Sequence, residues 1–236
     1  MANLENLDLY TAETTEGNKE LSKTKESGIF VPRRYVIGTR FLPEKICPCR
    51  NWYDAHQEIY NANLEAIKHN GQKIKMPVLS QAVDLLLYAS SSRRNDCDSE
   101  FFYDELIKHR NPWRTASIDA FFKLIKGEMI MYYDTVYDKE KGIFQKESVV
   151  LKNYLIELGW IDLHPENFTE QGLPRKLSKT QKPKEGKVIY YHPPVSDCVA
   201  RFSAASYGSG LGCYWDPSDV VASLGVIPCA EDAEAA

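Results

Sequence analysis

Apolar residues recur at every third or fourth position after Asn51, and a later segment is apolar on nearly all sides. The first spacing predicts an amphipathic helix that begins at Trp52, is capped by Asn51 and ends at Asn70-Gly71. The second segment, residues 81–89, predicts a helix buried in the centre of the fold. Two helices near the start of the ordered chain therefore set the first half of the architecture.

The rest of the chain mixes helical spacing with β-branched and aromatic runs. Further helices are predicted over 99–109, 115–126 and 149–158, and strands over 35–42, 127–134, 187–192, 201–207, 211–215 and 223–227, with a short strand or turn over 159–163. This order predicts an α+β fold, in which helices pack on a mostly antiparallel sheet and a central insertion is helical. Residues 1–28 are expected to form a polar arm, and residues 230–236 an acidic tail.

Composition excludes several classes of function. The formal net charge of −4 argues against nucleic-acid binding, which usually needs a basic domain. No apolar run approaches the roughly 18–20 residues that span a bilayer, so no membrane span is expected. The N-terminal residues lack the apolar core of a secretory signal, so no signal peptide is expected.

Cysteine spacing does not indicate a metal site. Among six cysteines, Cys47 and Cys49 form the only close pair, and the five histidines are scattered along the chain. A zinc site normally needs a second close pair of ligands. We expect free cysteines, with a disulfide from Cys47 or Cys49 to a distant partner as the alternative. No metal and no cofactor are predicted.

Residues 199–226 contain two kinds of position. One set is apolar and predicts a buried framework, namely Val199, Phe202, Leu211, Cys213, Ala222, Leu224 and Val226. Between these lie Ser, Gly, Tyr, Asp and Trp, which recognition surfaces favour. A turn is expected at Gly208–Gly210, after which Gly212 and Tyr214 point away from the core. The alternative is ordinary packing of an antiparallel sheet, in which Tyr and Trp also occur.

Two carboxylate–histidine pairs raise the question of acid–base catalysis. Asp54 and His56 lie two positions apart on a predicted helix, where side chains point to different faces. Asp162 and His164 would share a face if residues 159–163 form a strand. The chain has no nucleophile motif and no glycine-rich phosphate loop, so we predict no enzyme activity and no catalytic residue.

The C-terminal framework resembles the variable region of proteins that are diversified by retroelements, archaeal and archaeal-virus members in particular. The resemblance rests on Val199-Ala-Arg-Phe202, Ala204, Ser206, Leu211, Cys213, Pro217-Ser218 and Ala222-Ser-Leu-Gly-Val226. Residues 52–59 and 75–86 also resemble the first two helices of that family. In these proteins a reverse transcriptase rewrites chosen codons, and a C-type lectin fold displays the altered residues.

The resemblance implies one C-type lectin-like domain over residues 29–229, with an insertion over about 95–180 and a variable ligand-binding region over about 197–222. It implies a ligand-binding display protein whose partner is an unknown protein or cell-surface ligand. Because no signal peptide is expected, the expected location is a virion or the host-cell cytoplasm. The implied contact residues are Ser203, Ala205, Tyr207, Gly208, Ser209, Gly210, Gly212, Tyr214, Trp215, Asp216, Asp219, Val220 and Val221. The alternative function is a structural component of a viral particle or complex that uses the same surface for assembly.

Two departures from the family limit what the resemblance implies. Ile227 stands where the closing strand of related proteins usually has Arg. The calcium-binding tripeptides of sugar-binding C-type lectins are absent from the sequence. We therefore expect no calcium-dependent sugar site.

Overall fold

The computed structural model describes residues 50–68, 73–92, 103–104, 106–109, 113–179, 185–221 and 224–230. Several sequence predictions lie outside the described residues: the arm 1–28, the strand 35–42, the helix end at Asn70-Gly71, Cys47, Cys49, Cys97, and the acidic tail beyond Ala230.

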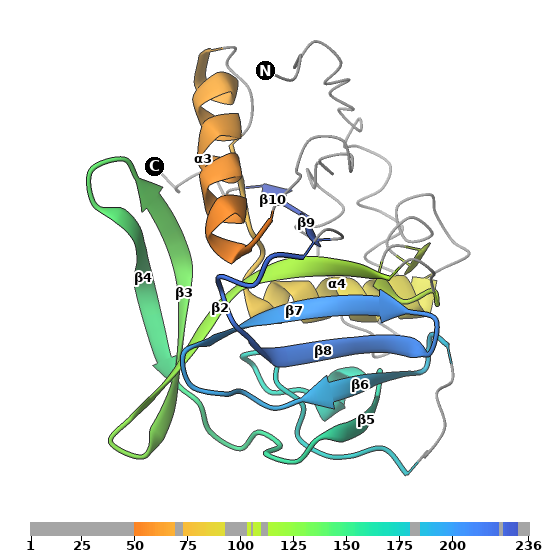
Figure 1. Ribbon diagram of the computed structural model, residues 1–236. Coiled ribbons are helices and arrows are strands. Elements are labelled where there is room, and N and C mark those ends of the chain that lie inside the picture. Colours follow the sequence, from red (N-terminus) through yellow and green to blue (C-terminus); the bar gives the residue numbers. More distant parts are fainter. Residues whose placement is uncertain are drawn as a thin grey trace, which may run out of the picture.

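The described elements form a mixed α+β fold (Figure 1). They are α3 (Trp52–Lys68), β1 (Ile74–Lys75), α4 (Leu79–Ser92), β2 (Arg114–Ile125), β3 (Glu128–Asp138), β4 (Gly142–Val150), β5 (Gly159–Asp162), the 3-10 turn η2 (Pro165–Asn167), β6 (Val188–His192), β7 (Cys198–Ala205), β8 (Gly208–Trp215), β9 (Leu224–Val226) and β10 (Cys229–Ala230). The predicted α+β class is confirmed. None of the helices described is both long enough and apolar enough to cross a bilayer.

One large sheet holds eight of the strands, mostly in antiparallel pairs. Its order is β4-β3-β2-β7-β8-β6-β5, and the short β9 pairs in parallel with the first part of β2. The β6–β8 pair is also parallel. Because β2 pairs with β7 on one side and with β3 and β9 on the other, the middle of the chain is joined directly to the C-terminal strands.

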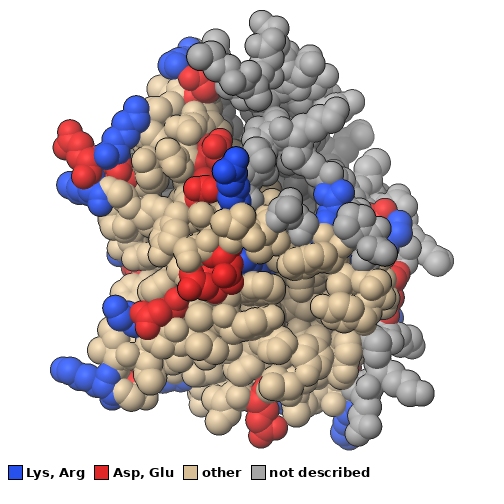
Figure 2. Space-filling model, viewed as in Figure 1, with Lys and Arg blue, Asp and Glu red and all other residues tan. Residues whose placement is uncertain are grey.

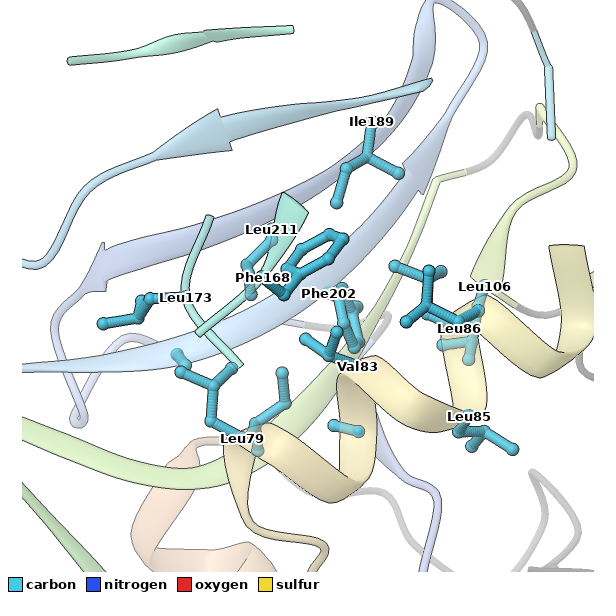
Figure 3. Packing of buried hydrophobic residues seen from close by; sticks show 14 of the residues in the cluster. Leu79, Val83, Leu85, Leu86, Leu106, Phe168, Leu173, Ile189, Phe202 and Leu211 are labelled. Carbon is cyan, nitrogen blue, oxygen red and sulfur yellow. The ribbon is translucent and has the colours of Figure 1, made fainter. Parts of the chain in front are cut away.

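Helix α4 covers one face of this sheet, behind β7 in the view of Figure 1. The opposite face, seen in Figure 2, carries few charged side chains over β8 and β6. On the covered face, Leu79, Val83 and Leu86 of α4 pack toward Phe202 of β7 and Leu211 of β8 (Figure 3). The predicted burial of the second helix is confirmed, because its apolar residues are almost fully enclosed.

Helix α3 is held by its first turn. The side-chain oxygen of Asn51 accepts a hydrogen bond from the Asp54 N–H at 2.9 Å, which is the predicted N-cap. The fully buried Trp52 donates its indole N–H to the Ile118 carbonyl of β2 at 2.9 Å. A second apolar cluster forms around Trp52 and includes Val199 and Leu224.

In the predicted helical insertion, the described residues 103, 104 and 106 of the predicted helix 99–109 are helical. The other two predicted helices are wrong, because residues 113–179 form strands, a 3-10 turn and irregular segments. Of the predicted helix 115–126, residues 115–125 lie in β2. Of the predicted helix 149–158, residues 149 and 150 lie in β4, and residues 151–158 form no regular element. The spacing of Ile118, Phe121 and Phe122 imitates a helix because β2 is buried on both faces and contains a bulge between Ser117 and Phe121. Residues 126 and 127 both have positive φ, which is the turn geometry that hairpins prefer.

A buried polar pair lies between α3 and β2. His56 Nε2 is 3.8 Å from Asp119 Oδ1, and both side chains are only about 4 % exposed. Burial lowers the pKa of His56 to about 3 and raises the pKa of Asp119 to about 6. The carboxylate of Asp119 accepts hydrogen bonds from the backbone N–H and the hydroxyl of Thr135. His56 is therefore neutral in the folded chain near pH 7.

Replacing His56 with Gln should change how stability depends on pH. Unfolded His56 takes up a proton below pH 6.5 while the folded residue stays neutral down to about pH 3, so acidification favours unfolding over that range. Asp119 has the opposite effect on stability between about pH 6 and pH 3.8, which is its pKa in the unfolded chain. This effect is present in both proteins. As the pH falls from 6.5 to 4.5, the free energy of unfolding of His56→Gln should rise by about 2–3 kcal/mol relative to that of the wild type, measured by urea unfolding. Parallel pH curves for the two proteins would contradict this assignment.

Candidate functional site

Strand β8 presents glycine on one face along most of its length. Gly208, Gly210 and Gly212 alternate with Ser209, Leu211 and Cys213, and the last two pack in the core under α4. β8 lies between β7 and β6, and its residues Gly210–Gly212 pair within the sheet on both sides. The uncovered face of β8 is therefore a smooth peptide floor with almost no side chains.

The registers of four strands place larger side chains beside this floor. Gly210 pairs with Ser203 of β7 and with Tyr190 of β6, and Tyr190 pairs with Trp160 of β5. Residues paired across a sheet project from the same face. The row from Trp160 to Ser203 therefore crosses the sheet with glycine in its middle. In the next row, Gly212 lies between His192 and Arg201.

Six rings form a continuous series around the floor. Ring centroids are separated by 6.2 Å for Trp113–Trp215, 5.0 Å for Trp215–Tyr214, 4.5 Å for Tyr214–His192, 5.2 Å for His192–Tyr190 and 5.0 Å for Tyr190–Trp160. These spacings fall in the range of favourable aromatic contacts. Burial lowers the pKa of His192, so this imidazole joins the series in its neutral form.

The floor and the rings border a hollow of about 560 Å³ that is open to solvent on one side. Its volume is in the range of small-molecule and peptide sites. None of the described residues that line the hollow carries a charge. The lining consists of Trp113, Trp160, Tyr190, His192, Ser203, Ala205, Ser206, Tyr207, Gly208, Ser209, Gly210, Leu211, Gly212, Tyr214 and Trp215.

Arg201 supports one wall from beneath. Its side chain is fully buried, with the guanidinium carbon 5.2 Å from the centre of the Trp215 ring. It donates to the carbonyl oxygens of Asp216 at 3.2 Å and Asp219 at 3.4 Å. Burial lowers the pKa of Arg201, while the carboxylates of Asp219 and Asp216 act in the opposite direction. Arg201 therefore fixes both Trp215 and the loop that follows it.

The structure brings together most of the contact residues implied by the sequence. Nine of the thirteen line the hollow, although Ala205 and Ser209 are each only 4 % exposed: Ser203, Ala205, Tyr207, Gly208, Ser209, Gly210, Gly212, Tyr214 and Trp215. Asp216, Asp219 and Val220 are exposed on the adjacent loop. Val221 lies in the interior with Trp52 and Leu224, and its N–H donates to the Arg50 carbonyl, so it does not reach this surface.

Backbone geometry limits which of these positions accept another side chain. The predicted turn at Gly208–Gly210 is wrong, because Ser206 and Tyr207 form the turn and β8 begins at Gly208. Gly208 has φ +147°, which favours glycine. A Cβ at Gly210 would lie 2.8 Å from the Tyr190 carbonyl oxygen. Tyr207, Tyr214, Asp216, Asp219 and Val220 are exposed and carry no such restriction.

Sequence reasoning missed five lining residues, whereas the sixth, Leu211, packs in the core as predicted: Trp113, Trp160, Tyr190, His192 and Ser206. The period of a strand would have placed Tyr190 and His192 on one face of the predicted strand 187–192. Trp113 and Trp160 reach the hollow through β2 and β5, whose positions in the sheet depend on long-range pairing.

The two carboxylate–histidine pairs do not assemble as catalytic pairs. His56 approaches Asp119 rather than Asp54, and that pair is buried away from the hollow. Asp162 accepts a hydrogen bond from the Ser178 hydroxyl at 2.6 Å, whereas His164 lies 3.9 Å from Glu166. Cys198, Cys213 and Cys229 are free thiols, and burial raises the pKa of Cys213.

Comparison with known proteins gives no match: no family model fits the chain, and neither a curated protein nor a solved structure matches it. Function is therefore argued from the geometry of the hollow.

Alanine at Gly210 should destabilise the fold more than alanine at Gly225. The Gly210 Cβ would collide with a backbone carbonyl, whereas the nearest heavy atom to a Cβ at Gly225 is the Thr115 carbonyl oxygen at 3.9 Å. We expect a loss of about 1–3 kcal/mol for Gly210→Ala and less than about 0.5 kcal/mol for Gly225→Ala, from urea unfolding.

Gly212→Ala should give a third outcome. Its Cβ would meet only the ends of side chains, Trp215 Nε1 at 2.6 Å and Tyr214 Cε1 at 2.9 Å. Side-chain atoms yield more easily than a backbone carbonyl, so near-ultraviolet circular dichroism should change while stability falls less than in Gly210→Ala. Equal stability of all three variants would show that the floor is not tightly packed.

Proposed function

We propose that this chain is a ligand-binding display protein, in which a C-type lectin-like scaffold presents C-terminal residues that a retroelement diversifies. The observation that carries the proposal is the gathering of nine of the thirteen implied contact residues around one hollow. The partner is a protein or a cell-surface ligand.

Burial of the intervening residues supports the proposal. Ala200, Phe202, Ala204, Leu211 and Cys213 are each at most 3 % exposed, whereas Tyr207 is 79 % and Tyr214 is 39 % exposed. In β7 and β8, the buried side chains on one face therefore stabilise the fold, and the exposed side chains lie on the other face or in the turn. Exposed residues can change with small effects on the free energy of unfolding.

The shape of the surface favours ligand binding over assembly. Tyr214 and Trp215 line a concave hollow whose size fits a ligand, whereas subunit interfaces bury a larger and flatter area. A rigid sheet also loses less ordering entropy on binding than a loop does.

Two libraries of equal size test the display function. The first randomises Tyr207, Tyr214, Asp216, Asp219 and Val220, and the control randomises Ala200, Phe202, Ala204, Leu211 and Cys213. Trp215 is kept because Arg201 packs beneath it. On a yeast surface, most members of the first library should resist protease and few members of the second should do so. Similar survival of the two libraries would refute a division between frame and display residues.

Single substitutions should show the same division. Leu211 is fully buried, so Leu211→Ala should lower the free energy of unfolding by about 2–5 kcal/mol. Tyr214→Ala should cost less than about 1 kcal/mol, because the ring lies at the edge of the hollow. Urea unfolding measures both values, and equal losses would place Tyr214 in the core.

Diversification itself can be tested in the genome that carries the gene. A near-copy of the 3′ end that differs at adenines, beside a reverse transcriptase gene, is the expected arrangement. A neighbourhood without these elements would refute diversification while leaving the ligand-binding hollow in place.

A further inference from the structure

We propose that the hollow binds a proline-rich segment in the polyproline II conformation; this inference rests on the proposed ligand-binding function and names the class of ligand. Three features of the hollow point to this ligand: the hydrogen-bonding groups of its wall, the absence of charge among the described lining residues, and the arrangement of its rings.

The wall offers hydrogen-bond donors that the protein itself does not use. Within the described part of the chain, no hydrogen bond engages the indole N–H of Trp113, Trp160 or Trp215, or the hydroxyl of Tyr190, Tyr207 or Tyr214. The Trp215 nitrogen lies over the glycine floor, 2.6 Å from the position of a Cβ at Gly212. An indole N–H can only donate. The hollow therefore suits a ligand that is rich in acceptor oxygens.

Charge narrows the choice of ligand. The lining residues are uncharged among those described, and Asp216 and Asp219 are exposed beside them, so phosphates and acidic peptides have no partner there. Arg201 does not alter this, because it is buried beneath Trp215 and donates to backbone carbonyls. Saccharide sites usually add carboxylate or amide side chains, and the lining has neither.

The floor itself offers no site for strand addition. Residues Gly210–Gly212 of β8 pair with both β7 and β6, so this part of the strand has no free edge for an extended peptide. A ligand must instead contact ring surfaces. A proline-rich segment offers pyrrolidine faces and unpaired carbonyl oxygens, and its prolines have no N–H groups to satisfy. Aromatic grooves bind such segments at a low entropic cost because the helix is already formed.

Nuclear magnetic resonance of the indole N–H groups tests the proposal in the full chain. Acetylated octaproline amide should shift the Trp113, Trp160 and Trp215 resonances, and a Gly-Ser octapeptide should not. Trp52 serves as an internal reference, because it is fully buried and its N–H is bonded to the Ile118 carbonyl. Substitution of each Trp by Phe assigns the resonances.

Removing one hydroxyl gives a sharper test. Tyr190→Phe keeps the ring but loses a donor, so octaproline affinity should fall about 2–10-fold. Tyr53→Phe, on α3 outside the hollow, should leave the affinity unchanged. An unchanged affinity in Tyr190→Phe would overturn the role assigned to this donor.

Three results would overturn the proposal: no shift with octaproline, equal shifts with the Gly-Ser peptide, or shifts caused only by cellohexaose or choline. The last result would assign the hollow to another class of ligand and leave the display function standing. Protease survival of the two libraries judges the display function separately, because that measurement requires no ligand.

Discussion

The structure depends on strand β8, which packs in the core on one face and forms the floor of the hollow on the other. β8 buries Leu211 and Cys213 against the core under α4, while its other face carries glycine at three alternating positions. Because β7 pairs with β8 on one side and β6 pairs with Gly210–Gly212 on the other, the central part of β8 has no exposed edge. The strand is thus fixed by its buried side, and the hollow on the other side is formed without a mobile loop.

Arg201 connects the core to the rim of the hollow. A buried guanidinium is costly unless its donors are used and its charge is balanced. Here the Trp215 ring lies against it and two carbonyls of the 216–219 loop accept from it, although its Nε and second terminal nitrogen have no hydrogen-bond partner among the described residues. The loop that carries Asp216 and Asp219 is therefore held by a residue that never reaches the surface.

Long-range pairing also brings distant parts of the chain to the hollow. β2 joins β7 and β9, and this pairing places Trp113 beside Trp215, about a hundred residues away in sequence. Helix α3 is attached to the same strand by Trp52 and by the buried His56–Asp119 pair. The middle of the chain is therefore part of the main sheet, although its sequence pattern indicated a helical insertion.

Local pattern determined the elements whose two faces differ in polarity. The cap at Asn51, the buried helix α4, strand β6 and the alternation of Leu211 and Cys213 with Gly212 and Tyr214 follow from neighbours a few residues apart. The pattern failed for β2, because a strand buried on both faces loses its period of two and a bulge shifts its register. Only the tertiary structure placed Trp113, Trp160 and Tyr190 around one floor, put Arg201 under Trp215, and paired His56 with Asp119. Each of these contacts joins residues far apart in the chain, and no local spacing encodes which strands become neighbours.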